Sequence, residues 1–115
     1  MAKKQNITFI EGNEPDYTIH ITRDGSDVDL TGSTFYMTVK SNNSYEDDMA
    51  LFKKTITSLP QAEQGIVTIH IDREDTLGKD LGSYYYDIVW KNNSGDIITL
   101  VYGNFYLIST TTRTV

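Results

Sequence analysis

Apolar and polar residues alternate along most of this chain, with the period of a β-strand that buries one face. The clearest case is the segment from Tyr17 to Thr22, in which tyrosine and isoleucine alternate with threonine and histidine. The last predicted strand is either continuous or a pair interrupted at Gly103, and residues 72–81 suit a helical turn. The period predicts strands over residues 7–9, 17–22, 34–39, 52–57, 65–71, 84–90 and 97–108.

Turn-forming residues separate the predicted strands. Asp24-Gly25 favours a tight turn because both residue types accept a positive φ angle, and Asn92-Asn93-Ser94-Gly95 predicts a hairpin loop. A chain of 115 residues has about the length of one domain and can bury a core without metals or disulfides. We therefore expect one all-β domain over residues 1–115, folded as an immunoglobulin-like antiparallel β-sandwich of about seven strands.

The segment 84–90 sharpens this fold prediction. Tyr84, Tyr86, Ile88 and Trp90 share one parity, so we expect Trp90 to be buried in the core. Tyr84 stands where immunoglobulin-like sandwiches place a tyrosine corner, whose hydroxyl bonds to the backbone a few residues upstream. The alternative is that Tyr84 is an ordinary aromatic residue of a strand.

Composition narrows the classes of partner. The net charge of −6 disfavours nucleic acid, because phosphate binding needs a basic face. The chain has no cysteine, which excludes a disulfide scaffold, a thiolate zinc site and a cysteine nucleophile. No segment has the length of a transmembrane helix, and the first residues lack the apolar stretch of a signal peptide. We expect a protein that is not secreted by a signal peptide and that binds neither nucleic acid nor membrane.

No catalytic motif in the sequence is complete. Gly32-Ser33-Thr34 and Gly82-Ser83-Tyr84 lack the second glycine of a serine-hydrolase elbow, and no glycine follows Asp75-Thr76. The acidic loop 24–29 lacks the glycine and the glutamate of an EF-hand, so we interpret it as a solvated turn. We expect no enzymatic activity, no catalytic or cofactor-binding residues and no metal.

The two histidines occur in near-identical segments, Thr18-Ile19-His20-Ile21 and Thr68-Ile69-His70-Ile71. In an immunoglobulin-like topology these segments are neighbouring strands, which would make His20 and His70 cross-strand partners. A metal site would still need a third ligand that the sequence does not visibly supply. The alternative is two exposed histidines in ordinary alternating strands.

Three tyrosines have the opposite parity to the predicted core, namely Tyr36, Tyr85 and Tyr106. Aromatic residues on the outer face of a sheet indicate a contact surface for protein or for stacking on sugar. A sugar site adds polar groups that bond the hydroxyls, and the sequence alone does not single any out. We therefore predict a protein interface that contains Tyr36, Tyr85 and Tyr106, and a homo-oligomer.

Three short motifs carry a family resemblance, namely Asp29-Leu30-Thr31-Gly32, Leu81-Gly82-Ser83-Tyr84-Tyr85-Tyr86-Asp87-Ile88 and Gly103-Asn104-Phe105-Tyr106-Leu107. The chain resembles small structural domains of tailed phages and prophages, such as the N-terminal domain of upper baseplate proteins, over most of residues 16–108. The resemblance implies an immunoglobulin-like sandwich that contacts copies of itself and other virion structural proteins, and it brings no catalytic residues.

The resemblance decides between two functional readings. We expect a non-catalytic structural or assembly protein of a phage or prophage tail or baseplate, made in the cytoplasm of a bacterial host and located in the virion. The alternative is a carbohydrate- or cell-surface-binding β-sandwich module.

Overall fold

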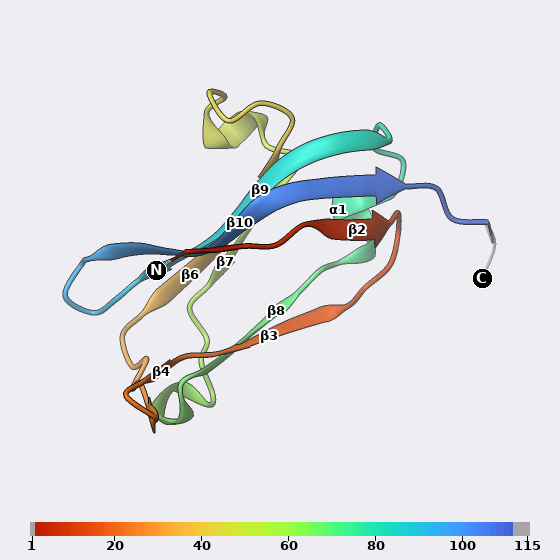
Figure 1. Ribbon diagram of the computed structural model, residues 1–115. Helices are drawn as coiled ribbons and strands as arrows, with labels where there is room; N and C mark the ends of the chain where they lie inside the picture. The colour runs from red at the N-terminus through yellow and green to blue at the C-terminus, as the bar shows by residue number, and fades with distance from the viewer. Residues whose placement is uncertain (1, 112–115) are drawn as a thin grey trace.

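Strands make up most of the regular structure of residues 2–111, the part of the chain that the computed structural model describes (Figure 1). All seven predicted strands form, and three two-residue strands join them. The strands are β1 (Lys3–Lys4), β2 (Ile7–Ile10), β3 (Asp16–His20), β4 (Thr22–Arg23), β5 (Ser26–Asp27), β6 (Thr34–Lys40), β7 (Phe52–Ile56), β8 (Ile66–His70), β9 (Gly82–Lys91) and β10 (Ile97–Ile108).

Helical segments are short. The predicted turn is α1 (Arg73–Thr76), and two 3₁₀ turns lie at η1 (Asp47–Met49) and η2 (Ala62–Gln64). Asp72 caps α1, because its side chain accepts a hydrogen bond from the backbone of Asp75 while the Asp75 carboxylate accepts one from the backbone N–H of Asp72. No helix among the described residues is long and apolar enough to cross a membrane.

The strands form a large sheet and a small sheet, as expected for an immunoglobulin-like sandwich. The large sheet has the order β1-β10-β9-β6-β7, with β2 also beside β10. The small sheet pairs β3 with β8, and β4 and β5 form a separate ribbon. Figure 1 shows β3 and β8 as a layer below β6, β9 and β10. The predicted all-β sandwich is thus confirmed.

The N-terminal strands depart from the antiparallel prediction. Both β1 and β2 pair with β10 in parallel. Between them the chain passes over Gly103, where a Cβ atom would collide with the carbonyl oxygen of Gln5. The N–H of Gln5 donates to the carbonyl of Tyr102, and the Gln5 carbonyl accepts from the hydroxyl of Tyr86. Because glycine permits this approach, β10 continues through Gly103 as one strand.

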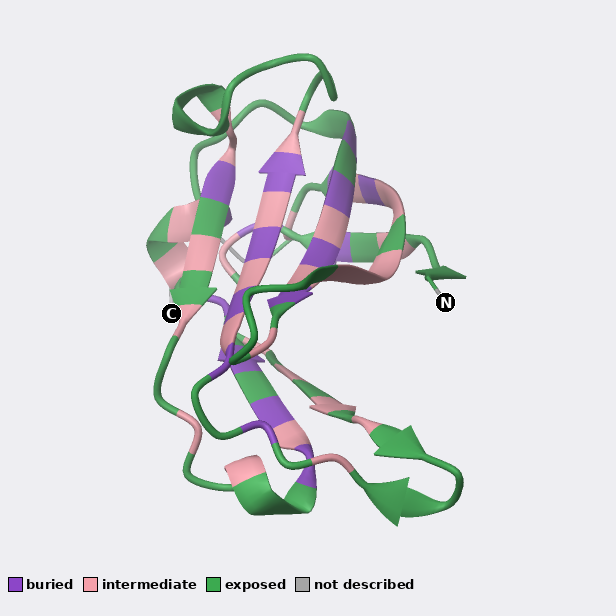
Figure 2. Ribbon diagram, turned by 90° about the vertical axis from the view of Figure 1, so that its left-hand side faces the viewer, coloured by how far each residue is buried: buried purple, intermediate pink, exposed green. Residues whose placement is uncertain are grey.

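Buried and more accessible residues alternate along the strands of the large sheet, as the bands in Figure 2 show. The inward rows of both sheets meet in one hydrophobic cluster, to which Phe9 and Leu30 add side chains from outside the longest strands. The inward residues of those strands are Phe35, Met37 and Val39 on β6, Val67 and Ile69 on β8, Tyr84, Tyr86, Ile88 and Trp90 on β9, and Phe105 and Leu107 on β10.

Two aromatic residues of β9 behave as predicted. Trp90 is 6% exposed, its ring is stacked on Phe35 with centroids 6.2 Å apart, and its Nε1 donates to the Oγ of Ser33 at 2.9 Å. The hydroxyl of Tyr84 donates to the carbonyl of Asp80 at 2.5 Å, four residues upstream. Tyr84 is therefore a tyrosine corner, and the alternative of an ordinary strand aromatic is excluded.

Trp90→Ala should lower the free energy of unfolding by about 3–5 kcal/mol, because it opens a cavity in the core and leaves Ser33 without its partner. Urea unfolding followed by circular dichroism measures the change. Met49→Ala is the control, since Met49 is 60% exposed and its truncation should stay within about 0.5 kcal/mol. An emission maximum of native Trp90 equal to that of free tryptophan would contradict the burial.

Tyr84→Phe should cost about 1 kcal/mol, because the ring stays in place while the Asp80 carbonyl loses its donor. Thermal and urea unfolding both report this loss. Tyr45→Phe is the matched control, since Tyr45 is exposed. Equal stability of Tyr84→Phe and wild type would show that the corner contributes nothing to the fold.

Candidate functional site

The three predicted contact tyrosines all lie on the outer face of the large sheet. Tyr36 on β6 stands opposite Val89, Tyr85 on β9 opposite Asn104, and Tyr106 on β10 opposite Ser83. Their inward neighbours along each strand are buried in the core, whereas Tyr85 is 44% exposed and the other two are partly exposed. The three side chains therefore lie on the face that their parity predicts.

A hollow of about 640 Å³ lies on this face, across β6, β9 and β10. Tyr36 and Tyr85 line it, and so does Tyr102, which the sequence reading missed. Tyr106 is not among the lining residues. Tyr102 was missed because β10 contains a register shift between Thr99 and Val101, which breaks the alternation just before it. Tyr102 has the same parity as Tyr106, and this shared parity would have identified Tyr102 from the sequence.

Asp87 occupies the middle of the hollow. It stands on β9 between Tyr85 and Val89, opposite Thr38 of β6 and Tyr102 of β10. Burial raises the pKa of this carboxyl, and the positive charge of Lys40 opposes part of that increase. Within residues 2–111 the Asp87 carboxylate has no hydrogen bond or ion pair, so its acceptor capacity is free.

The lysines at the rim are bound to another aspartate. The ammonium groups of Lys40 and Lys53 lie 2.8 and 2.5 Å from the carboxylate oxygens of Asp47. These two hydrogen bonds lower the pKa of Asp47 to about 2. The ammonium group of Lys53 also lies 5.0 Å from the ring centroid of Tyr36, within cation–π range. The hollow thus has a paired cationic rim and an unpaired carboxylate at its centre.

A second feature of the same face is an apolar end, which we define as Ile10, Leu81, Tyr106 and Ile108. Ile108 of β10 pairs with Ile10 of β2. Leu81 immediately precedes Gly82, the first residue of β9, and Gly82 pairs with Leu107, the residue before Ile108. The three aliphatic side chains are 40–51% exposed. The predicted tyrosines are therefore divided between two places, the hollow and the apolar end.

The structure confirms the pairing of the two histidine segments and the alternative of two exposed histidines in alternating strands, but His20 and His70 are not cross-strand partners. β3 and β8 do pair in the small sheet, but Thr18 stands opposite Thr68 at the centre of that pair. Because the two strands run in opposite directions, equivalent residues of the two similar segments lie at opposite ends of the strand pair. His70 therefore stands opposite Asp16, and His20 opposite Ile66, so the histidines are not cross-strand partners.

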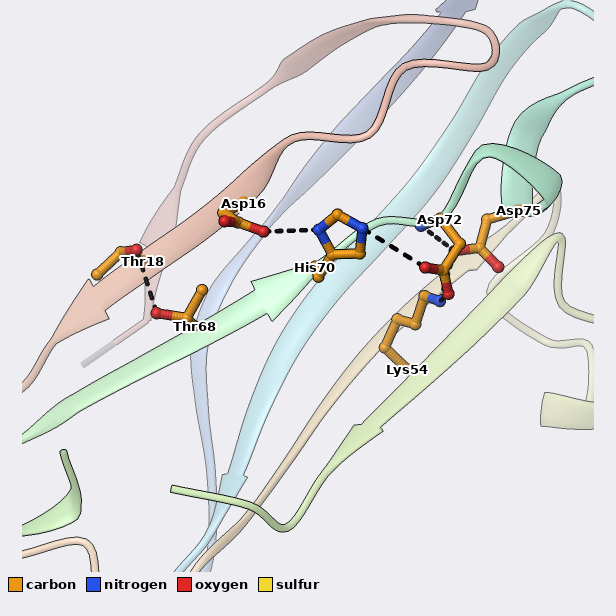
Figure 3. A network of polar contacts seen from close by, with 7 residues as sticks. All are labelled: Asp16, Thr18, Lys54, Thr68, His70, Asp72 and Asp75. Atoms are coloured by element: carbon orange, nitrogen blue, oxygen red, sulfur yellow. Dashed lines mark hydrogen bonds and ion pairs between the residues drawn. The ribbon is translucent and has the colours of Figure 1, made fainter. Parts of the chain in front are cut away.

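Each histidine has an aspartate partner of its own. The Nε2 of His20 lies 2.7 Å from a carboxylate oxygen of Asp27. His70 lies between two carboxylates, with Nδ1 2.7 Å from Asp16 and Nε2 3.5 Å from Asp72 (Figure 3). The hydrogen bond that His70 donates to Asp16 raises the pKa of His70 despite the opposing effect of desolvation.

The surroundings of His70 supply the additional oxygen ligands that the sequence did not reveal. One ligand atom from each of Glu14, His70 and Asp72 lies within 4.8 Å of the others, close enough to hold a metal ion. All three residues are exposed, and the ammonium group of Lys54 already lies 2.6 Å from Asp72 (Figure 3). Exposed acidic groups commonly gather in this way without a metal, and Lys54 supplies the positive charge here.

Comparisons with known proteins do not assign this chain to a family. No family model matches it, and no curated protein is significantly similar to it in sequence. The class that the structure defines is an all-β sandwich with a hollow and an apolar end on the outer face of its large sheet.

Asp16→Asn should lower the pKa of His70 toward its ordinary value of 6.5, because the variant loses the charged hydrogen-bond partner. In the wild type the raised pKa of His70 stabilises the folded state at pH values below the ordinary histidine pKa. This stabilisation is lost as the pH rises through the pKa that His70 has in the folded state. Nuclear magnetic resonance (NMR) titration of the imidazole signals measures both values.

Asp27→Asn is the matched control, because Asp27 pairs with His20 and leaves the His70 cluster unchanged. The difference in stability between Asp16→Asn and wild type should be present near pH 6 and absent at about pH 9. An unchanged pKa of His70 in Asp16→Asn would contradict the assignment of Asp16 as its partner.

Proposed function

We propose that this protein is a non-catalytic structural domain of a phage or prophage tail or baseplate, and that it assembles with copies of itself and with neighbouring virion proteins. The observation that carries the proposal is the apolar end. Ile10, Leu81 and Ile108 expose their aliphatic side chains together beside Tyr106. Such a patch on the outer face of a sheet is typical of a surface that another protein covers.

The sheet edges support assembly at the same place. β2 lies at one edge of the large sheet, and its sequence Ile7-Thr8-Phe9-Ile10 carries no charge. At the other edge β7 carries Lys53 and Lys54, and lysines on an edge strand discourage pairing with another chain. At the first edge β1 contributes Lys3 and Lys4, so it is the β2 part of this edge that carries no charge, and that part adjoins the apolar end. A partner that covers the apolar end can therefore also pair with β2.

The motifs that resemble tail domains are also those that build this sandwich, which supports the proposal. At the Asp29-Leu30-Thr31-Gly32 turn, the Asp29 carboxylate accepts hydrogen bonds from the backbone N–H and the hydroxyl of Thr31, at 2.9 and 2.6 Å. Gly32 has a φ of 80°, and Leu30 is fully buried in the core. The second motif contains the tyrosine corner, and the third contains Gly103 and the buried Phe105.

We expect a closed homo-oligomer centred on the apolar end, because closed symmetry limits the growth that open contacts allow. Its interface should bury at least about 1,000 Å² in total. Size-exclusion chromatography with light scattering should show the wild type as an oligomer. The double variant Leu81→Asp, Ile108→Asp should elute as a folded monomer, because two desolvated carboxylates oppose burial of the patch.

Met49→Asp is the control, since it adds a charge to another exposed apolar residue and should leave the oligomer intact. A monomeric wild type at high concentration would contradict self-assembly. The tail assignment has its own test, which is mass spectrometry of particles released by the strain that carries the gene. Absence of the chain from purified tails would overturn that assignment while leaving the oligomer prediction standing.

A further inference from the structure

The hollow brings together exposed aromatic rings and free hydrogen-bonding groups. Tyr85 and Tyr102 are each 44% exposed and flank Asp87, one along β9 and the other across on β10. Within the described part of the chain, the side chains of Asp87 and Asn104 have no hydrogen-bond partner. Asn104 stands opposite Tyr85, so these polar and aromatic groups alternate over a small area.

This combination matches the surface of a sugar ring. A pyranose has an apolar face that packs on aromatic rings and a girdle of hydroxyls that donate and accept hydrogen bonds. Pockets with aromatic walls and a few convergent polar groups are typical of small-ligand sites, and about 640 Å³ lies within their usual range. Asp87 and Asn104 therefore supply the polar groups that a sugar site requires beside the tyrosines, and that the sequence alone did not single out.

We propose that the hollow on the outer face of the large sheet binds a neutral saccharide. The Asp87 carboxylate accepts hydrogen bonds from two sugar hydroxyls, and Asn104 donates to and accepts from a third. Tyr85 and Tyr102 provide apolar contact on either side of Asp87. This function is additional to assembly, because the apolar end lies outside the hollow.

The charges favour a neutral ligand over an anionic one. Asp87 at the centre repels a carboxylate or phosphate, and Lys40 and Lys53 at the rim are already paired with Asp47. A quaternary ammonium ligand would need several rings around one point. Here no two of the lining tyrosines are in ring contact, and Tyr36 already has the Lys53 ammonium group beside it.

The test is a titration of the isotope-labelled protein, followed by two-dimensional NMR. Neutral tetrasaccharides of glucose, mannose, galactose and N-acetylglucosamine are added separately. At least one should give saturable shifts of amides in β6, β9 and β10, with a Kd of about 1 mM or tighter. No saturable shift with any of the four would overturn the proposal.

Variants of the hollow locate the site. Asp87→Asn and Tyr102→Ala should each weaken binding at least about tenfold, because one loses the charged acceptor and the other an aromatic contact. Asp48→Asn and Tyr45→Ala are the matched controls, since both residues are exposed and neither lines the hollow. Unchanged binding in both hollow variants, with their folding verified by thermal unfolding, would overturn the proposal.

Two further measurements separate this site from assembly and from another ligand. The double variant Leu81→Asp, Ile108→Asp should bind the saccharide as wild type does, whatever its oligomeric state. Binding by that variant but not by the wild type would mean that a second copy covers the hollow, which overturns the proposal. Saturable shifts with choline and with none of the saccharides would reassign the hollow to a quaternary ammonium ligand, and they overturn the proposal as well.

Discussion

The register of β9 between β6 and β10 is the constraint on which both faces of the large sheet depend. A slip of one residue would carry every core side chain of β9 to the outer face. Three contacts oppose such a slip along the length of the strand. Tyr84 bonds to the Asp80 carbonyl at one end, Trp90 stacks on Phe35 and bonds to Ser33 at the other, and Tyr86 bonds to Gln5 between them.

The same register builds the candidate site. Because Tyr84, Tyr86, Ile88 and Trp90 face inward, the residues between them must face outward, which brings Asp87 to the surface of the sheet. Pairing with β6 and β10 then surrounds this residue with groups from three strands. The hollow is a consequence of how the core is packed, so its geometry is as rigid as the strands that carry it.

Periodicity was sufficient to predict the strands, the burial of Trp90 and the outward tyrosines, because each of these follows from the parity of one strand. It was not sufficient where two strands had to be aligned. The separation of His20 from His70 depends on the pairing of Thr18 with Thr68, and no local pattern specifies that pairing. Asp87 became significant only through its neighbours on β6 and β10, which lie far from it in the sequence.

At Asp87 the stability of the fold and the chemistry of the site oppose each other. Burial raises the pKa of this carboxyl, so above the ordinary carboxyl pKa its ionised form destabilises the folded state relative to the unfolded chain. Asparagine fills the same space without that penalty, and stability alone therefore favours it. A carboxylate bonded to its own domain would have fewer acceptor sites left for a ligand. The free acceptor at the centre of the hollow is what a binding site requires, and the small loss of stability comes with keeping it free.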